Sequence, residues 1–171
     1  MQRIETIITD FLILAKPQAV SYQIKQVNTV LSETLDLLSA QAAMLNIQFD
    51  IKYGELPLVH CEANQLKQVF INLIKNAIEA MPDGGIIEVS TELFFDNHIL
   101  VSIQDHGIGI PKSVLKKLGE PFYTTKEKGT GLGLMVTYKI IEEHEGWIEV
   151  NSKEGEGTLF QLYLPIFHEN A

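Results

Sequence analysis

The amino-acid sequence predicts an α+β two-layer sandwich, in which about three helices cover a mixed, largely antiparallel sheet. Residues 86–95 and 98–104 alternate as two strands joined through Asp96 and Asn97, which is typical of an antiparallel hairpin. Residues 68–81 carry apolar side chains at the three-to-four spacing of a helix with one buried face. Three such helices together with six or so strands favour helices packed on a sheet.

The first expected helix covers residues 1–16, where apolar side chains recur every three or four positions. It ends at Lys16, because the residue before a proline disfavours helical geometry. The pattern is equally compatible with a helix docked on its own domain and with a bundle helix that meets a partner chain. Residues 22–27 then alternate as a strand, and Asn28 or Thr29 is placed to cap a helix that runs to about Asn46.

The remaining elements follow from alternation and turn signals. We expect a half-buried strand over residues 47–52, a short extended piece over residues 56–61, and the central helix, closed by a turn at residues 82–85. After the hairpin, regular structure largely disappears from 105 to 133, apart from a helical turn near 113–118, and loops of this length are often functional. The last expected elements are a helix over 134–144 and strands over 147–150 and 159–164, around a turn at 155–157.

Composition limits the possible functions. The chain has 171 residues, is 46% hydrophobic and has a net charge of −9, which predicts one domain plus an appendage and argues against a nucleic-acid or anionic membrane surface. Five of the 13 lysines and arginines fall between positions 112 and 128, and such a local patch suits a small polyanion.

A single cysteine, Cys61, excludes an internal disulfide and fits a reducing compartment. With no long apolar run or leader, we expect a soluble, cytoplasmic chain without membrane contact of its own.

Two asparagines interrupt the central helix. Asn72 and Asn76 are four residues apart, so their carboxamides lie one turn apart on one side of the helix, at the border of its apolar stripe. Taken alone, the pair is as compatible with ordinary surface asparagines as with a ligand site.

Three glycine-bearing segments follow. In the first, Asp105 at a strand end precedes Gly107 and Gly109, which would allow a ligand to approach the backbone closely. A carboxylate accepts hydrogen bonds, so at a nucleobase it suits the exocyclic amine of adenine and repels the O6 acceptor of guanine. A plain turn would have the same residues.

The second segment, residues 129–134, runs directly into a helix, whose free N–H groups and positive dipole end favour phosphate. It lacks the pattern of a Walker loop and does not follow a strand as a Rossmann fingerprint does, and a flexible linker would look similar. The third segment, residues 155–160, is most often a hairpin turn.

In this order, the asparagine pair, DHGIGIP, EPFYTTKEKGTGLGL and GEGTLFQLYLP are far more specific than any one of them. Over nearly all of residues 20–165 the chain resembles the ATP-binding catalytic domain of sensor histidine kinases, within the wider family of Hsp90, gyrase and MutL ATPases. The segment FLILAKPQ after the first helix is similar to the sporulation-kinase group of Bacillus-type bacteria. The resemblance implies the Bergerat ATP-binding fold, with ATP and Mg²⁺ as cofactors.

The resemblance also implies roles for individual residues. Asn76 would bind Mg²⁺, and Asn72, Asn76 and Lys126 would form the catalytic set. The nucleotide would contact both asparagines and a larger set that includes the ATP lid: Lys75, Asp105, Gly107, Gly109, Ile110, Phe122, Thr124, Thr125, Lys126, Gly129, Thr130, Gly131, Leu132, Gly133, Leu134 and Thr158.

Position 72 separates the branches of the family. ATPase members carry a glutamate there that activates water, whereas Asn72 cannot act as a general base at neutral pH. The site would therefore hold ATP for an external nucleophile. Many relatives have a lysine where this chain has Glu79, so Lys75 or the lid lysines would compensate. None of the five histidines stands in a phosphoacceptor motif, so the acceptor histidine is expected from outside the chain.

These features predict the domain organisation and the partners. Residues 1–18 resemble the end of the second helix of a dimerisation and phosphoacceptor domain, residues 19–168 the catalytic domain, and residues 169–171 a tail. The expected partners are the protein's own dimerisation domain, a second copy in a full-length homodimer that is membrane-anchored upstream, a response regulator and a small antikinase protein.

The fragment alone would be inactive in autophosphorylation. The alternatives are an anti-sigma-type serine kinase and a nucleotide-binding module without transfer.

Overall fold

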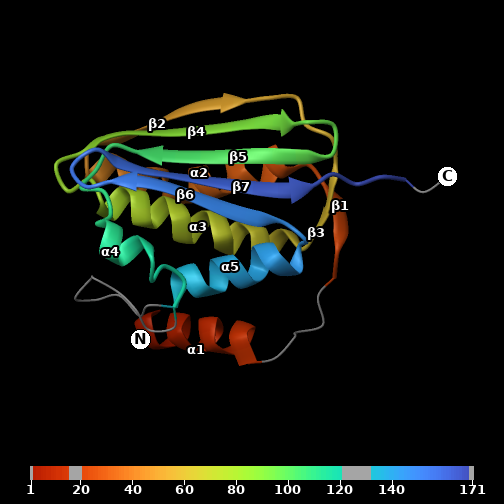
Figure 1. Ribbon diagram of the computed structural model, residues 1–171, viewed down its shortest axis with the longest axis horizontal. Helices are drawn as coiled ribbons and strands as arrows, with labels where there is room; N and C mark the ends of the chain where they lie inside the picture. Colours follow the sequence, from red (N-terminus) through yellow and green to blue (C-terminus); the bar gives the residue numbers. More distant parts are fainter. Residues whose placement is uncertain (1, 16–20, 121–131, 170–171) are drawn as a thin grey trace.

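The structure is a computed structural model that describes residues 2–15, 21–120 and 132–169. A five-stranded sheet forms one layer and helices cover one of its faces (Figure 1). Its order is β2-β4-β5-β7-β6, and β2 pairs in parallel with β4 while the other neighbours are antiparallel. The predicted fold class is confirmed. The strands are β2 (Ile47–Tyr53), β4 (Gly85–Phe94), β5 (His98–Asp105), β6 (Trp147–Lys153) and β7 (Gly157–Pro165).

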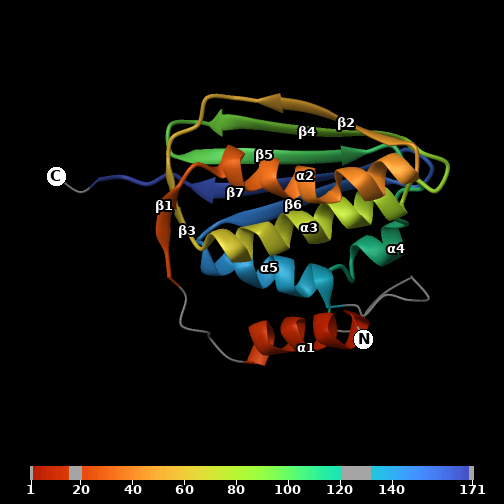
Figure 2. The same cartoon turned by 180° about the vertical axis from the view of Figure 1, so that it is seen from behind.

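The helical layer consists of α2 (Val27–Met44), α3 (Ala63–Glu79) and α5 (Gly133–Glu143), as Figure 2 shows from behind. The middle helix, α3, presents its apolar stripe to the sheet and to both neighbouring helices. It begins at Ala63 because the Glu62 side chain caps it, accepting hydrogen bonds from the backbone N–H groups of Asn64 and Gln65. The buried residues of this stripe are Leu66, Val69, Phe70, Leu73, Ile74, Ala77 and Ile78.

The start of α2 differs from the prediction. The residue before the helix is Gln26, and neither Asn28 nor Thr29 caps it. Asn28 lies inside the helix, where its Nδ2 donates to the carbonyl of Gly54 at 2.9 Å and its Oδ1 accepts from Thr91 Oγ1 at 2.8 Å. Asn28 was predicted to cap the helix, and instead it ties α2 to Gly54, directly after β2, and to Thr91 on β4. The preceding strand is correspondingly shorter than residues 22–27.

That strand, β1 (Gln23–Lys25), pairs antiparallel with β3 (Val59–Cys61) in a small separate sheet. Between β5 and α5, the only regular element in the described residues is the single turn α4 (Lys112–Leu115), close to the predicted turn. Strand β6 continues to Lys153, beyond the predicted end at Val150. The predicted hairpin turn around Gly155 then leads into β7.

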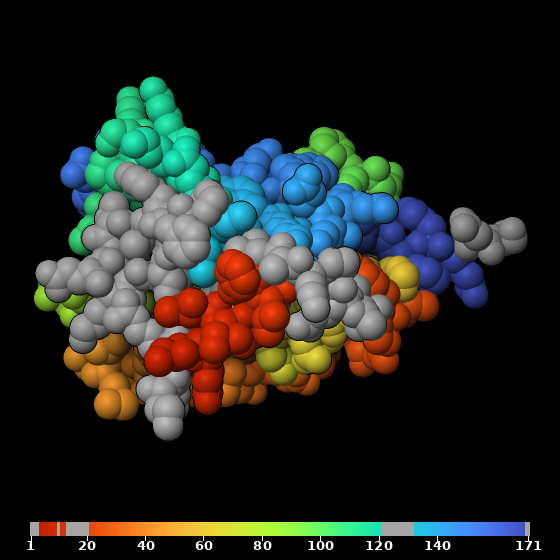
Figure 3. Space-filling model, turned by 90° about the horizontal axis from the view of Figure 1, so that it is seen from below, coloured from red at the N-terminus to blue at the C-terminus, as the bar shows by residue number. Residues whose placement is uncertain are grey.

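The N-terminal helix α1 (Gln2–Ala15) lies against α5. Figure 3, seen from below, shows α1 on the molecular surface with α5 beside it. Four of its apolar residues, Ile4, Ile8, Phe11 and Leu12, remain between 42% and 62% exposed. The helix thus contacts its own domain but leaves part of its apolar stripe uncovered. No helix in the described ranges is long and apolar enough to cross a bilayer.

Candidate functional site

The loop after β5 is fixed at one end of the sheet by contacts with two other elements. The N–H of Ile108 donates to the carbonyl of Ala80 at the end of α3, at 3.0 Å, and the N–H of Gly155 donates to the carbonyl of Ile108 at 2.7 Å. The N–H of Ile110 donates to Ser152 Oγ on β6 at 2.8 Å. The loop is therefore held between the end of α3 and the β6–β7 hairpin.

Both glycines of this loop are required by the protein's own backbone. A Cβ at Gly107 would lie 2.2 Å from the carbonyl oxygen of Ala80. Gly109 has a φ of +69°, and a Cβ there would lie 2.1 Å from the carbonyl oxygen of Lys153. The close packing of the loop thus requires both glycines, and their predicted role in admitting a ligand stays a prediction.

Asp105 and Thr158 form a buried polar pair where the loop leaves the sheet. They are register partners on β5 and β7, and each is 4% exposed. Burial raises the pKa of the Asp105 carboxyl, and the backbone N–H groups of Gly107 and Thr158 partly offset this by hydrogen bonding to the carboxylate. The Gly107 N–H lies 2.9 Å from Asp105 Oδ1. The pair therefore places a carboxylate and a hydroxyl side by side where β5 ends and β7 begins.

Asn72 joins α3 to the start of α5. Its Nδ2 donates to the carbonyl of Gly133 at 3.0 Å and to Thr137 Oγ1 at 3.2 Å, and its Oδ1 accepts from Gln68 Nε2 at 3.1 Å. Thr137 Oγ1 in turn donates to the same Gly133 carbonyl at 2.8 Å. The predicted ligand residue thus holds the first turn of α5, where the predicted glycine run ends.

Asn76 lies one turn further along α3 and is partly buried, whereas Lys75 and Glu79 are exposed. A carboxamide oxygen is a hard donor of the kind Mg²⁺ prefers, and this ion is usually bound by few protein groups together with waters and substrate phosphates. No group of three or more histidine, cysteine, aspartate or glutamate side chains in the described part of the chain could hold a metal alone. Asn76 therefore fits an ion that arrives with a nucleotide.

The start of α5 contains the other described members of the predicted site. Leu132 precedes the helix and is 1% exposed, and Gly133 and Leu134 form its first turn. The predicted residues Phe122, Thr124, Thr125, Lys126, Gly129, Thr130 and Gly131 lie outside the described residues.

Ser152 on β6 also contacts this end of the sheet, and the sequence pattern did not indicate it. Its Oγ touches Ile110, Gly157 and Thr158, so it links the loop after β5 to the β6–β7 hairpin. The predicted strand ended at Val150, so Ser152 lay outside it, whereas β6 extends to Lys153. Continuing the alternation of Ile148 and Val150 by one more step would have placed Ser152 on the same face.

Two of the histidines, His144 and His106, have partners outside the predicted site. His144 is 4% exposed, its Nε2 accepts from the Glu62 N–H at 3.1 Å, and its Nδ1 lies 2.7 Å from the Ile140 carbonyl. Burial lowers the pKa of His144, so the neutral ring is favoured. His106 is exposed and lies 2.7 Å from Glu88. His144 therefore has a structural role, and His106 forms an exposed ion pair if its ring is protonated.

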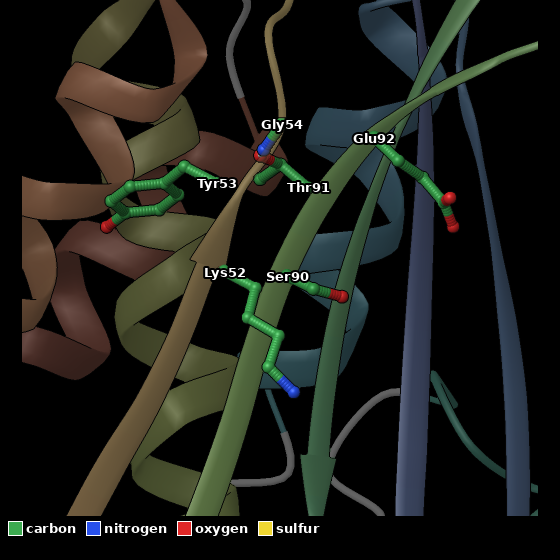
Figure 4. A pocket seen from close by; sticks show the side chains of 6 residues that line it. All are labelled: Lys52, Tyr53, Gly54, Ser90, Thr91 and Glu92. Carbon is green, nitrogen blue, oxygen red and sulfur yellow. The ribbon is translucent and has the colours of Figure 1, made fainter.

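A separate hollow lies on β2 and β4 (Figure 4). It contains none of the predicted site residues. Glu88 on β4 pairs with Gln104, next to Asp105 at the end of β5. The residues of β4 that line the hollow come after Glu88, so the hollow lies away from Asp105 along the strands. Its lining residues are Lys52, Tyr53, Gly54, Ser90, Thr91 and Glu92.

Residues 61–168 match the family described as histidine kinase-, DNA gyrase B-, and HSP90-like ATPases. Sporulation kinase E of Bacillus subtilis is 58% identical over 100% of this chain, which spans only 23% of that kinase. The catalytic domain of the histidine kinase ThkA superposes with a TM-score of 0.77 at 34% identity, covering 85% of this chain and 96% of that domain. ThkA in complex with the response regulator protein TrrA superposes with a TM-score of 0.79 at 29% identity, covering 97% of this chain and 48% of ThkA. These similarities confirm the resemblance predicted from the sequence motifs.

Proposed function

Because this chain belongs to the histidine kinase-, DNA gyrase B-, and HSP90-like ATPases and is a histidine kinase catalytic domain, we propose that it binds Mg-ATP and donates the γ-phosphate to a histidine of a dimerisation domain. From that histidine the phosphoryl group passes to a response regulator aspartate. The observation that carries the proposal is the buried pair of Asp105 and Thr158 at the end of the sheet.

The pair supports recognition of adenine. A buried carboxylate that already accepts backbone hydrogen bonds can accept one more. The exocyclic amine of adenine can donate this hydrogen bond. Guanine would bring its O6 acceptor to the same place. An acceptor facing a buried carboxylate leaves both groups without a donor, which is costly in a dry site.

The phosphates lie, in this proposal, between Asn76 on α3 and the first turn of α5. The free N–H groups at a helix start favour negative charge, and the lysines of residues 112–128 add positive charge nearby in sequence. The ion held with Asn76 supplies charge neutralisation for the transferring phosphoryl group. Phe122, Thr124, Thr125, Lys126, Gly129, Thr130 and Gly131 complete the proposed site.

Asn72 directs the site toward transfer and away from hydrolysis. Phosphoryl transfer requires mainly positioning and charge stabilisation, whereas hydrolysis also requires that water be activated or oriented. A carboxamide cannot accept a proton at neutral pH, and the Asn72 carboxamide is bound to Gly133, Thr137 and Gln68. We therefore infer that the chain holds ATP intact until an acceptor histidine is presented.

We further propose that residues 1–18 form the end of a dimerisation helix and that residues 19–168 form the catalytic domain. The uncovered apolar residues of α1, between Ile4 and Leu12, support a helix that continues into a bundle with a second copy. The complex of ThkA with its response regulator supports a response regulator as partner. Binding of an antikinase, a cytoplasmic location and an upstream membrane anchor stay predictions from the sequence.

Calorimetric titration with ATP, with and without Mg²⁺, tests the nucleotide site. We expect Asn76→Ala to lose the Mg²⁺-dependent part of the affinity, while Asn151→Ala, an exposed change on β6, leaves it unchanged. Unchanged binding by Asn76→Ala would remove Asn76 from the site. Incubation of the unmutated chain with labelled ATP should release phosphate only very slowly, and rapid multiple-turnover release would contradict the role given to Asn72.

A further inference from the structure

Three polar side chains form a row across three neighbouring strands. Asp105 on β5 is the register partner of Thr158 on β7, and Thr158 is the register partner of Ser152 on β6. Side chains of directly opposite residues lie on the same face of a sheet, here the face that carries the helices. Ser152 therefore stands behind the Asp105–Thr158 pair, on the far side of Thr158.

The hydroxyl of Ser152 has three partners at hydrogen-bond distance. Its Oγ lies 2.8 Å from the N–H of Ile110, 2.9 Å from the carbonyl of Gly157 and 2.8 Å from Thr158 Oγ1. A hydroxyl has one proton to donate and two lone pairs. The Ile110 N–H can only donate, so it uses one lone pair of Ser152. The Gly157 carbonyl can only accept, so it takes the single proton.

This count fixes the direction of the Thr158 hydroxyl. Because the proton of Ser152 goes to Gly157, the contact with Thr158 requires Thr158 to donate its own proton to Ser152. The hydroxyl of Thr158 then has only lone pairs to offer to a ligand. The Asp105 carboxylate also accepts hydrogen bonds, so both side chains of the pair offer only acceptors to a ligand.

We propose that Ser152 is a specificity-determining positioning residue, which holds Thr158 as an obligate acceptor so that the Asp105–Thr158 pair binds a 6-aminopurine and rejects a 6-oxopurine. This inference rests on the proposed function, in which the pair faces the base of ATP. Without Ser152, the Thr158 hydroxyl can rotate and donate to an oxygen at the 6-position. Ser152 acts through Thr158 and does not itself touch the nucleotide.

The test compares ATP with inosine triphosphate. The base of inosine triphosphate has an oxygen at the 6-position and an N1–H, whereas adenine has an amine at the 6-position and an N1 that accepts hydrogen bonds. Dissociation constants of both Mg-nucleotides are measured for the unmutated chain and for Ser152→Ala. We expect the preference for ATP to fall about tenfold in Ser152→Ala, the factor that corresponds to roughly one hydrogen bond, about 1.4 kcal/mol. Ser152→Thr keeps a hydroxyl and should therefore keep the preference for ATP of the unmutated chain.

A double-mutant cycle separates this role from a merely structural one. Thr158→Val removes the hydroxyl while keeping the branched shape, so adding Ser152→Ala to it should leave the ATP preference unchanged. A structural role for Ser152 would instead weaken both nucleotides by the same factor in either background. That outcome, or an unaltered preference in Ser152→Ala, overturns the inference.

The unmutated chain provides a measurement that does not depend on the folding of variants. An acceptor-only pair predicts that purine riboside triphosphate, which has no group at the 6-position, binds more tightly than inosine triphosphate. The reverse order would overturn the inference. If the unmutated chain binds no ATP, or binds ATP and inosine triphosphate equally, the proposed adenine site itself fails.

Discussion

Replacing Asn72 with aspartate exchanges one nitrogen for oxygen and removes both donor contacts of this side chain to α5. In the structure Asn72 Nδ2 donates to the Gly133 carbonyl at 3.0 Å and to Thr137 Oγ1 at 3.2 Å. Thr137 has one proton, which it now donates to the same carbonyl, so it can serve that carbonyl or a carboxylate at position 72 but not both. A carboxylate at position 72 would therefore always leave one acceptor without a donor at the junction of α3 and α5.

The expected cost follows from these contacts. Each lost hydrogen bond contributes about 1 kcal/mol, and the charge placed near the Gly133 carbonyl adds to this, so we expect Asn72→Asp to lower the free energy of unfolding by about 2 to 3 kcal/mol. For a chain of this size that corresponds to a fall in Tm of about 4 to 12 °C. Because a protonated aspartate can donate once, the loss should shrink at acidic pH.

Thermal unfolding followed by circular dichroism measures this loss, with the unmutated chain as reference at each pH. Asn151→Asp is the matched control, since it makes the same chemical change at an exposed position on β6, where about 0.5 kcal/mol or less is expected. If Asn72→Asp unfolds within about 1 °C of the unmutated chain, or if Asn151→Asp loses as much, the contacts of Asn72 do not hold the two helices together.

Three further changes test other parts of the structure. Asp105→Asn should weaken the preference for ATP over GTP, and equal affinities in the unmutated chain, measured by calorimetry, would exclude Asp105 as the adenine-reading group. Gly107→Ala should cost more than about 2 kcal/mol of stability in denaturant unfolding, because its Cβ would meet a carbonyl oxygen at 2.2 Å, whereas Gly133→Ala, whose nearest neighbour would lie at 3.8 Å, should be tolerated. His144 has a folded pKa below its ordinary 6.5, so the stability it contributes is present above pH 6.5 and is lost as the pH falls through the folded pKa. The drop in Tm between pH 8 and pH 5 should thus be smaller in His144→Gln, which cannot gain a proton opposite the Glu62 N–H, and an equal drop would contradict this role.

Most of the fold could be predicted because helical and strand periodicities are local properties. The stripe of α3 and the hairpin of β4 and β5 depend on spacing alone, and both are confirmed. The parallel pairing of β2 with β4 was not predicted, because it joins strands that are separated by α3 in the chain. The cap of α2 was wrongly predicted, because a capping pattern does not reveal that Asn28 has one partner directly after β2 and another on β4.

The site was predicted in part, for a related reason. The position of Asp105 at a strand end and its pairing with Thr158 agree with the motif order. The sequence could not show that Asn72 binds the first turn of α5, or that Gly107 and Gly109 are needed for packing against other backbone segments. Ser152 was missed because its role depends on three partners that lie far from it in the chain or across a hairpin.

The most direct test of the account is the chemistry of the transferred phosphoryl group. The chain is mixed with a separately produced helical domain that carries a phosphoacceptor histidine, together with ATP labelled at the γ-phosphate, and the label on that domain is treated with acid and with base. If the chain phosphorylates histidine, the label is acid-labile and base-stable, and it disappears when Asn76 is replaced by alanine. A base-labile label would indicate a serine kinase, and no label from a chain that binds Mg-ATP would indicate a nucleotide-binding module; either result would contradict histidine phosphorylation.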